Sequence, residues 1–100
     1  MKQERFYALC VRECEGCIDE ENHIAYHEDQ FDRWVATDIQ SGLVLMRDVV
    51  GYATCEEFIE HVMSLMEEIN KKRSALKWQY CVDILQTFIK YRKSMTECES

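Results

Sequence analysis

The spacing of apolar residues changes once along this chain, near residue 52. Before that point, short apolar runs are separated by polar and glycine-containing segments, which is typical of β-strands. After it, apolar residues recur every three or four positions over two long segments, which is typical of α-helices. Strands followed by helices within 100 residues predict one α+β domain over residues 1–100. We expect a small, mainly antiparallel sheet of three or four strands with two C-terminal helices packed on it.

The clearest β element is a hairpin over residues 32–50. Gly42 can adopt positive φ, and Asp38 is suited to capping a four-residue turn that ends at Gly42. This turn predicts that Trp34 lies opposite Arg47 in a cation–π pair. The same register pairs Val35 with Met46 and Arg33 with Asp48, whereas a three-residue turn would shift every pair by one.

Three further segments precede this hairpin. Residues 5–13 are rich in aromatic, β-branched and small apolar residues, which predicts a strand buried on both faces. Residues 14–22 carry Gly16 and a cluster of charges, which predicts a loop. Residues 23–27 are a weaker strand candidate, with a short helix as the alternative.

The second half of the chain predicts two helices. Residues 53–72 begin with a capping box of Thr54 and Glu57 and have an acidic outer face. Residues 74–94 have an apolar arc of roughly 200°, wider than a helix on one sheet needs. The last helix is therefore either sandwiched between the sheet and the first helix, or it meets another subunit. Self-association, as a homodimer, would use Tyr80, Ile84 and Tyr91, extended by Met95.

Acidic residues are concentrated in one part of the sequence. The formal net charge is −7, and residues 13–32 contain no lysine or arginine. Such a stretch repels nucleic acid, so we expect no direct nucleic-acid binding. A protein partner with a basic surface fits it better. The residues expected to form this acidic face are Glu13, Glu15, Asp19, Glu20, Glu21, Glu28 and Asp29.

Cysteines at positions 10, 14 and 17 suggest two interpretations. Cys14 and Cys17, with His23 or His27, would supply ligands for zinc, which prefers four tetrahedral nitrogen or sulfur donors. If residues 23–27 form a strand, however, His23 and His27 lie about 13 Å apart. We therefore favour structural cysteines and expect no cofactor, and a small zinc-binding protein is the alternative.

Catalytic motifs are missing from the sequence, which has no P-loop, dinucleotide fingerprint or H-E-x-x-H segment. We therefore do not expect an enzyme. No apolar run approaches the roughly 18 residues of a membrane helix, and no signal-peptide pattern opens the chain. The sequence thus predicts a small, acidic, cytoplasmic, non-catalytic protein-binding module, a regulator or inhibitor. Acidic inhibitors encoded by phages and mobile elements provide an analogy.

Overall fold

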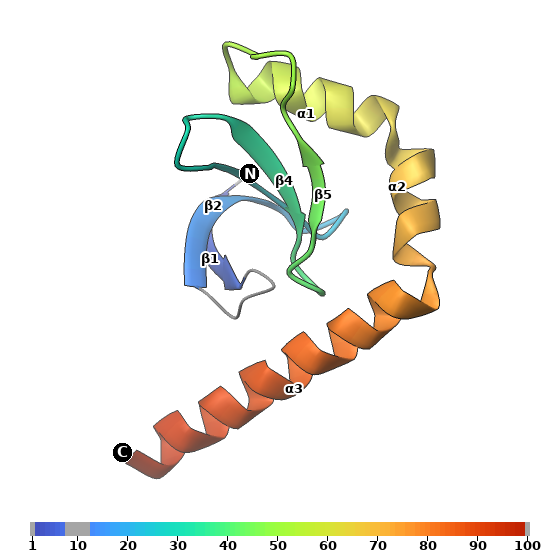
Figure 1. The fold of residues 1–100 in the computed structure, drawn as a ribbon. Helices are drawn as coiled ribbons and strands as arrows, with labels where there is room; N and C mark the ends of the chain where they lie inside the picture. Colours follow the sequence, from blue (N-terminus) through green and yellow to red (C-terminus); the bar gives the residue numbers. More distant parts are fainter. Residues whose placement is uncertain (1, 8–12, 100) are drawn as a thin grey trace.

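The computed structural model describes residues 2–7 and 13–99, with side chains for residues 3–7 and 14–93. The described strands form one antiparallel sheet in which each strand pairs with the next along the chain (Figure 1). The strands are β1 (Lys2–Tyr7), β2 (Glu13–Asp19), β3 (Ile24–Glu28), β4 (Trp34–Asp38) and β5 (Val44–Arg47). The helices that follow are α1 (Cys55–Ser64), α2 (Met66–Arg73) and α3 (Leu76–Glu99). The predicted α+β fold is confirmed, and the described residues form five strands in place of three or four and three helices in place of two.

The prediction of a loop over residues 14–22 was wrong, because β2 occupies most of that segment. Gly16 is buried inside this strand, where an added Cβ would lie 2.7 Å from the carbonyl oxygen of Tyr26 and 3.1 Å from the Phe6 ring. The glycine therefore permits a close approach between strands instead of making a turn.

The first strand also differs from its prediction. β1 begins at Lys2, and Gln3, Glu4 and Arg5 are exposed, so its described part is an edge strand and is not buried on both faces. The remainder of the predicted strand, residues 8–12, lies outside the described residues.

The strand prediction for residues 23–27 is confirmed by β3. Its side chains alternate between two apolar clusters on opposite faces of the sheet. The larger cluster packs the sheet against α1 and α2, and the smaller one lies on the other face. The buried residues of the larger cluster are Ile24, Tyr26, Ala36, Leu45, Phe58, Val62 and Ile69. Those of the smaller cluster are Phe6, Ile18 and Ala25.

The hairpin of β4 and β5 has the predicted turn. The N–H of Gly42 donates to the carbonyl of Asp38 at 2.7 Å, and the Asp38 side chain caps the turn. A β-bulge then shifts the pairing by one residue beyond Thr37. The predicted pairs are therefore wrong: Arg47 lies opposite Val35, and Trp34 accepts a backbone hydrogen bond from Asp48.

The predicted helix over residues 53–72 starts as expected but is interrupted. The Thr54 hydroxyl accepts the N–H of Glu57 at 3.3 Å and caps α1. At Leu65 the backbone leaves the helical region, with φ −112° and ψ 16°. The Ser64 hydroxyl donates to the His61 carbonyl at 2.6 Å, so a side chain hydrogen-bonds this helix carbonyl at the break. The interruption redirects α2 around the sheet (Figure 1).

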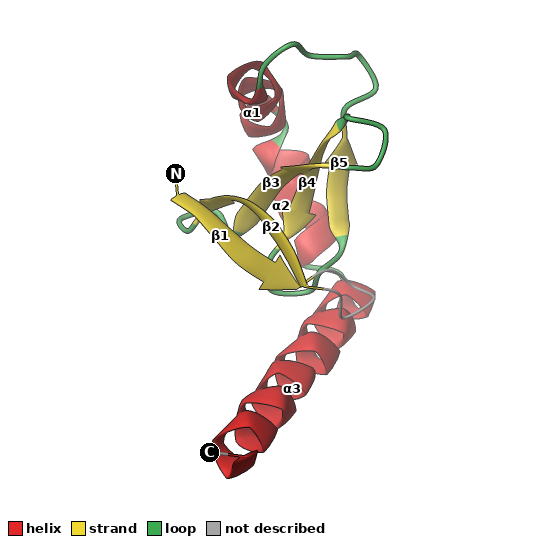
Figure 2. Ribbon diagram, turned by 90° about the vertical axis from the view of Figure 1, so that its left-hand side faces the viewer, coloured by secondary structure: helices red, strands yellow, loops and turns green. Residues whose placement is uncertain are grey.

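The last helix, α3, begins near its predicted start and passes across one end of the sheet. Its far end projects well beyond the strands, as both ribbon views show (Figures 1 and 2). The molecule measures 45 × 29 × 23 Å along its principal axes and is therefore elongated.

Candidate protein-binding surfaces

The acidic residues of segment 13–32 lie in two groups at opposite ends of the β2–β3 hairpin. Asp19, Glu20 and Glu21 lie at the closed end, where Asp19 pairs with Ile24. The Asp19 carboxylate accepts the Asn22 side-chain N–H at 2.8 Å and so orders this turn. Because consecutive strands run in opposite directions, acids that are close in sequence have been separated in space.

The second acidic group lies at the open end of the same hairpin. Glu28 ends β3 and is exposed, Asp29 follows it, and Glu15 is exposed on β2. The side chain of Glu13 lies outside the described side chains. Arg47 approaches Asp29 at 3.7 Å, and Arg5 pairs with Glu15 across β1 and β2. Arginines therefore balance part of this group.

The β3–β4 turn is held by the side chain of Asp29. Its Oδ1 accepts the N–H of Phe31 at 2.8 Å and the N–H of Arg33 at 3.1 Å. These backbone hydrogen bonds, together with Arg47 and Arg33, hold the pKa of Asp29 below its ordinary value. Asp32 takes a left-handed conformation with φ 59°, which aspartate tolerates better than most residues. The turn is thereby fixed with the Phe31 side chain outside.

The loop after β5 is built in the same way around Asp48. This buried carboxylate accepts three N–H groups: Val50 at 2.9 Å, and Gly51 and Tyr52 at 2.8 Å each. Burial raises the pKa of Asp48, but the three hydrogen bonds and Arg33 outweigh it, so the pKa lies below 3.8. The carboxylate thus holds a tight loop.

These two loops lie side by side at one end of the sheet. Asp48 donates its N–H to the Trp34 carbonyl at 2.8 Å, and Arg33 is close enough to lower the pKa of both aspartates. Both ribbon views place the β3–β4 turn beside the loop that leads to α1 (Figures 1 and 2).

Three apolar side chains project from this end of the molecule. Phe31 is 71% exposed, Val49 83% and Val50 67%. The exposed carboxylates of Glu28 and Asp32 lie on the same β3–β4 segment. We call this surface the loop face and define it by these five residues. Sequence reasoning missed the apolar part of this face. A signal was present, because Asp29 and Asp48 are of the residue type that orders turns, and each binds N–H groups two to four residues further along the chain.

The cysteine and histidine candidates for zinc are dispersed. Cys14 and Cys17 are three residues apart in a strand, so they lie on opposite faces of the sheet. Cys17 packs against the larger cluster and Cys14 against the smaller one. His23 is exposed in the β2–β3 turn, and His27 Nε2 is 2.7 Å from Thr37 Oγ1. Among the described residues, no three His, Cys, Asp or Glu side chains are grouped to hold a metal ion. Cys10 lies outside them.

The half-buried thiol of Cys55 shares the larger cluster with Cys17. Burial, with added repulsion from Cys17, Glu56 and Glu28, raises its pKa to about 11. A thiol with that pKa is protonated at neutral pH and is a poor nucleophile. This environment matches the structural role expected of cysteines on apolar helix faces.

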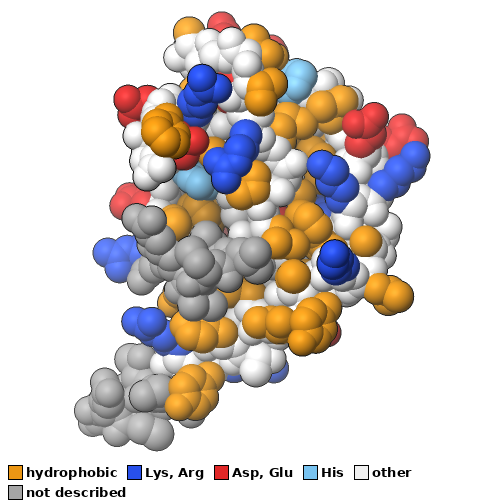
Figure 3. Space-filling view, in the orientation of Figure 1, with side chains coloured by type: hydrophobic (Ala, Val, Ile, Leu, Met, Phe, Trp, Pro, Cys, Tyr) orange, Lys and Arg blue, Asp and Glu red, His pale blue; other side chains and the backbone are white. Residues whose placement is uncertain are grey.

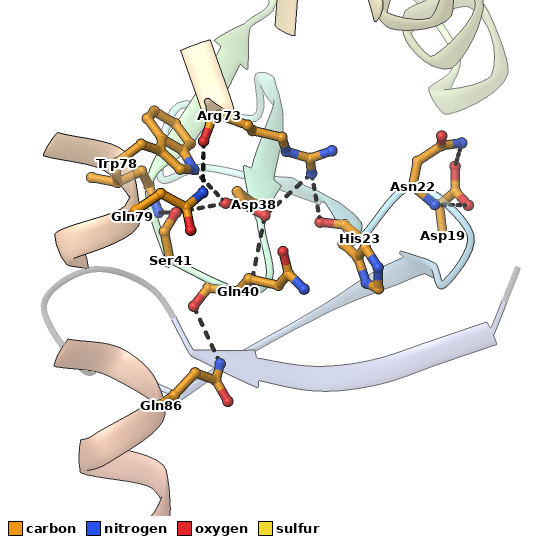
Figure 4. A network of polar contacts seen from close by, with 11 residues as sticks. Asp19, Asn22, His23, Asp38, Gln40, Ser41, Arg73, Trp78, Gln79 and Gln86 are labelled. Atoms are coloured by element: carbon orange, nitrogen blue, oxygen red, sulfur yellow. Dashed lines mark hydrogen bonds and ion pairs between the residues drawn. The ribbon is translucent and has the colours of Figure 1, made fainter. Parts of the chain in front are cut away.

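A buried hydrogen-bond network joins three parts of the fold (Figure 4). The Asp38 carboxylate is almost fully buried and accepts the Ser41 hydroxyl at 2.8 Å, Arg73 Nη2 at 3.2 Å and Trp78 Nε1 at 2.6 Å. Arg73 Nη2 also donates to the His23 carbonyl at 2.9 Å. The network therefore fixes the β4–β5 turn, the β2–β3 turn and the α2–α3 junction relative to one another.

The residues predicted for self-association are exposed on α3. Tyr80 is 68% exposed, Ile84 49% and Tyr91 65%, and Leu76 at the start of the helix is 89% exposed. Figure 3 shows apolar side chains along the part of the molecule where α3 lies. Met95 lies outside the described side chains. One chain alone does not bury this arc, and the sandwiched alternative is therefore wrong.

No helix in the described part of the chain is both long and apolar enough to cross a membrane. No family model matches the chain, and neither a curated protein nor a solved structure is significantly similar to it.

Proposed function

We propose that this protein is a small, non-catalytic protein-binding module, a regulator or inhibitor, that uses the loop face to bind a basic surface of its partner. The observation that carries the proposal is the exposure of Phe31, Val49 and Val50 on two loops that Asp29 and Asp48 hold in place. Exposed apolar side chains on flexible loops would lose conformational entropy on binding. Ordered loops lose less, so more of the contact energy appears as affinity.

The chemistry of the loop face suggests a division of roles. Its apolar side chains are suited to fill pockets at the centre of an interface, where a few residues carry most of the binding energy. Its rim includes the exposed carboxylates of Glu28 and Asp32, and the first turn of α1 adds Glu56 and Glu57. A basic surface on the partner would be attracted by this rim, which raises association rates and disfavours acidic competitors.

Cys17, Cys55 and Cys81 form no disulfide in the described part of the chain, which supports action in a reducing compartment, and we place the protein in the cytoplasm. Nothing in the proposal needs a cofactor, nucleic acid or a membrane.

Affinity capture from the native cell, with several baits in parallel, tests the proposal. The wild-type bait should retain a basic protein that the Phe31→Ser/Val50→Ser bait retains at least about 30-fold less tightly, as expected for hot-spot residues. A Glu20→Gln/Glu21→Gln bait is the matched control, because it removes charge at the opposite end of the hairpin. If all three baits retain the same proteins equally, the loop face is not the binding surface.

A further inference from the structure

One side of α3 is largely apolar and exposed along about three turns of helix. Tyr80, Ile84, Thr87 and Tyr91 follow one another at intervals of four, three and four residues, and all are exposed. Spacings that alternate between three and four place side chains in one stripe along a helix, the pattern of a helix–helix seam. We call these four residues the α3 seam.

The opposite side of α3 already packs on the body of its own chain. Leu85 is buried and Gln86 donates to the Gln40 carbonyl at 3.2 Å. At about 100° per residue, both of these residues are turned away from the seam. Phe88 is four residues after Ile84 and lies at one edge of the seam, where its ring is 6.0 Å from that of Tyr7. The four seam residues themselves remain exposed, so a second helix can pack along them.

We propose that the α3 seam binds the α3 seam of a second copy of this chain, with the two helices antiparallel. In the register that aligns all four seam residues, Tyr80 packs against the partner's Tyr91 and Ile84 against the partner's Thr87. A two-fold axis then passes between Ile84 and Thr87, so both ends of the interface are equivalent. This surface is separate from the loop face, and the inference stands whether or not the proposed function is correct.

Charge complementarity selects this arrangement. Asp83 and Lys90 flank the seam on the same side and are both exposed. They are seven residues apart, about 10 Å along the helix, too far to pair within one chain. In the antiparallel register each Asp83 lies beside the partner's Lys90, and the two-fold axis repeats the pair. A parallel, in-register pair would bring Tyr91 against its own copy and leave both charges without this contact.

The size of the interface sets the expected affinity. Four seam residues and two exposed ion pairs form a contact below the standard size of stable complexes, although Leu76 can extend it. We therefore expect a dimer with a dissociation constant on the order of 1–100 µM. An assay at protein concentrations well below this value would detect only the monomer.

Sedimentation equilibrium from roughly 1 to 500 µM tests the inference. The wild type should be a reversible dimer. Asp83→Lys and Lys90→Asp should each weaken it by about 10-fold or more, because each variant faces two like-charge pairs. An equimolar mixture of the two variants should dimerise again, because every pair in the mixed dimer has opposite charges. Lys93→Asp makes the same charge change as Lys90→Asp, on another side of α3, and should leave dimerisation unchanged.

A wild type that stays monomeric over the whole range would overturn self-association through α3. A wild-type dimer that both charge reversals leave intact, or a mixture that remains as weak as the separate variants, would overturn the antiparallel register. Recovery in the mixture cannot come from refolding of a damaged variant, since each variant is also measured alone.

Discussion

Gly16 shows how a single residue can mislead a reading of the sequence. A glycine among charged residues indicates a turn, but Gly16 lies within β2. Glycine fits this position because the backbone of β3 and the Phe6 ring leave no room for a Cβ. A glycine can indicate either a close approach between strands or a turn, so the residue type alone does not distinguish the two. Only the position of β3 distinguishes them, and that position depends on tertiary structure.

Gly16→Ala should therefore destabilise the fold by about 1–3 kcal/mol, the usual cost of overpacking. The nearest atom is a backbone carbonyl oxygen, which cannot move aside as a side chain would. Urea unfolding of the variant and the wild type measures the difference. Gly51→Ala is the comparison, because its Cβ would meet nothing within 4 Å and only its positive φ adds strain. Equal stability of Gly16→Ala and the wild type would contradict the packing shown here.

Asp48 predicts a specific loss of stability in acid. Its pKa in the folded protein lies below the ordinary 3.8, because backbone N–H groups bind the charged form in spite of burial. The stabilisation is thus complete above the unfolded pKa and is lost as the pH falls through the folded pKa. The difference in unfolding free energy between wild type and Asp48→Asn should shrink from about pH 5 to about pH 2. A difference that stays constant over this range would refute the role of Asp48.

At the scale of elements, the hairpin illustrates what local sequence determines. Asp38 and Gly42 specify the turn between β4 and β5, and the turn forms as predicted. The bulge beyond Thr37 has no comparable local signal, because it depends on how β5 packs Leu45 into the larger cluster. The break between α1 and α2 at Leu65 is similar: the periodicity of apolar residues continues through it, and α2 packs in the larger cluster through Ile69, a tertiary contact.

Asp38 holds elements together, so its replacement should affect more than one. Asp38→Ala leaves Arg73 and Trp78 without their buried acceptor and should cost about 3–5 kcal/mol, as for breaking a buried ion pair. Trp78→Phe removes one hydrogen bond and should cost less. Thermal unfolding measures both. We expect amide hydrogen exchange in Asp38→Ala to rise in α3 as well as in the β4–β5 turn. A rise confined to the turn would show that the network does not fix α3.

The whole molecule explains why the fold class was predictable and the proposed binding surface was not. The change of apolar period predicts strands before helices, and a chain with that order forms an α+β domain. Surfaces, in contrast, are assembled from residues that are distant in sequence. The acidic segment 13–32 is divided between two ends of a hairpin, whereas the exposed side chains of Phe31 and Val49 come from two neighbouring loops. Three of the four α3 seam residues, Tyr80, Ile84 and Tyr91, were candidates from the sequence because one helix carries them all, and their side chains are exposed.

The overall shape also follows from α3. The radius of gyration is 14.3 Å, compared with about 13 Å for a typical domain of 100 residues. The helix extends past the sheet, where a single helix has little to pack against and is marginal alone in water. This projecting helix carries the α3 seam, along which we propose that a second copy packs.

The most direct test of the proposed binding module is the association rate of the captured partner at roughly 0.1 M and 1 M salt, where the Debye length falls from about 10 to about 3 Å. We predict a rate that falls at least about 10-fold with salt and also falls in Glu28→Gln/Asp32→Asn, but little in Glu20→Gln/Glu21→Gln. Rates that respond neither to salt nor to substitution at either end would show that the acidic residues do not guide a basic partner. A response only to the Glu20 and Glu21 changes would show that the partner binds at the closed end of the β2–β3 hairpin and not at the loop face.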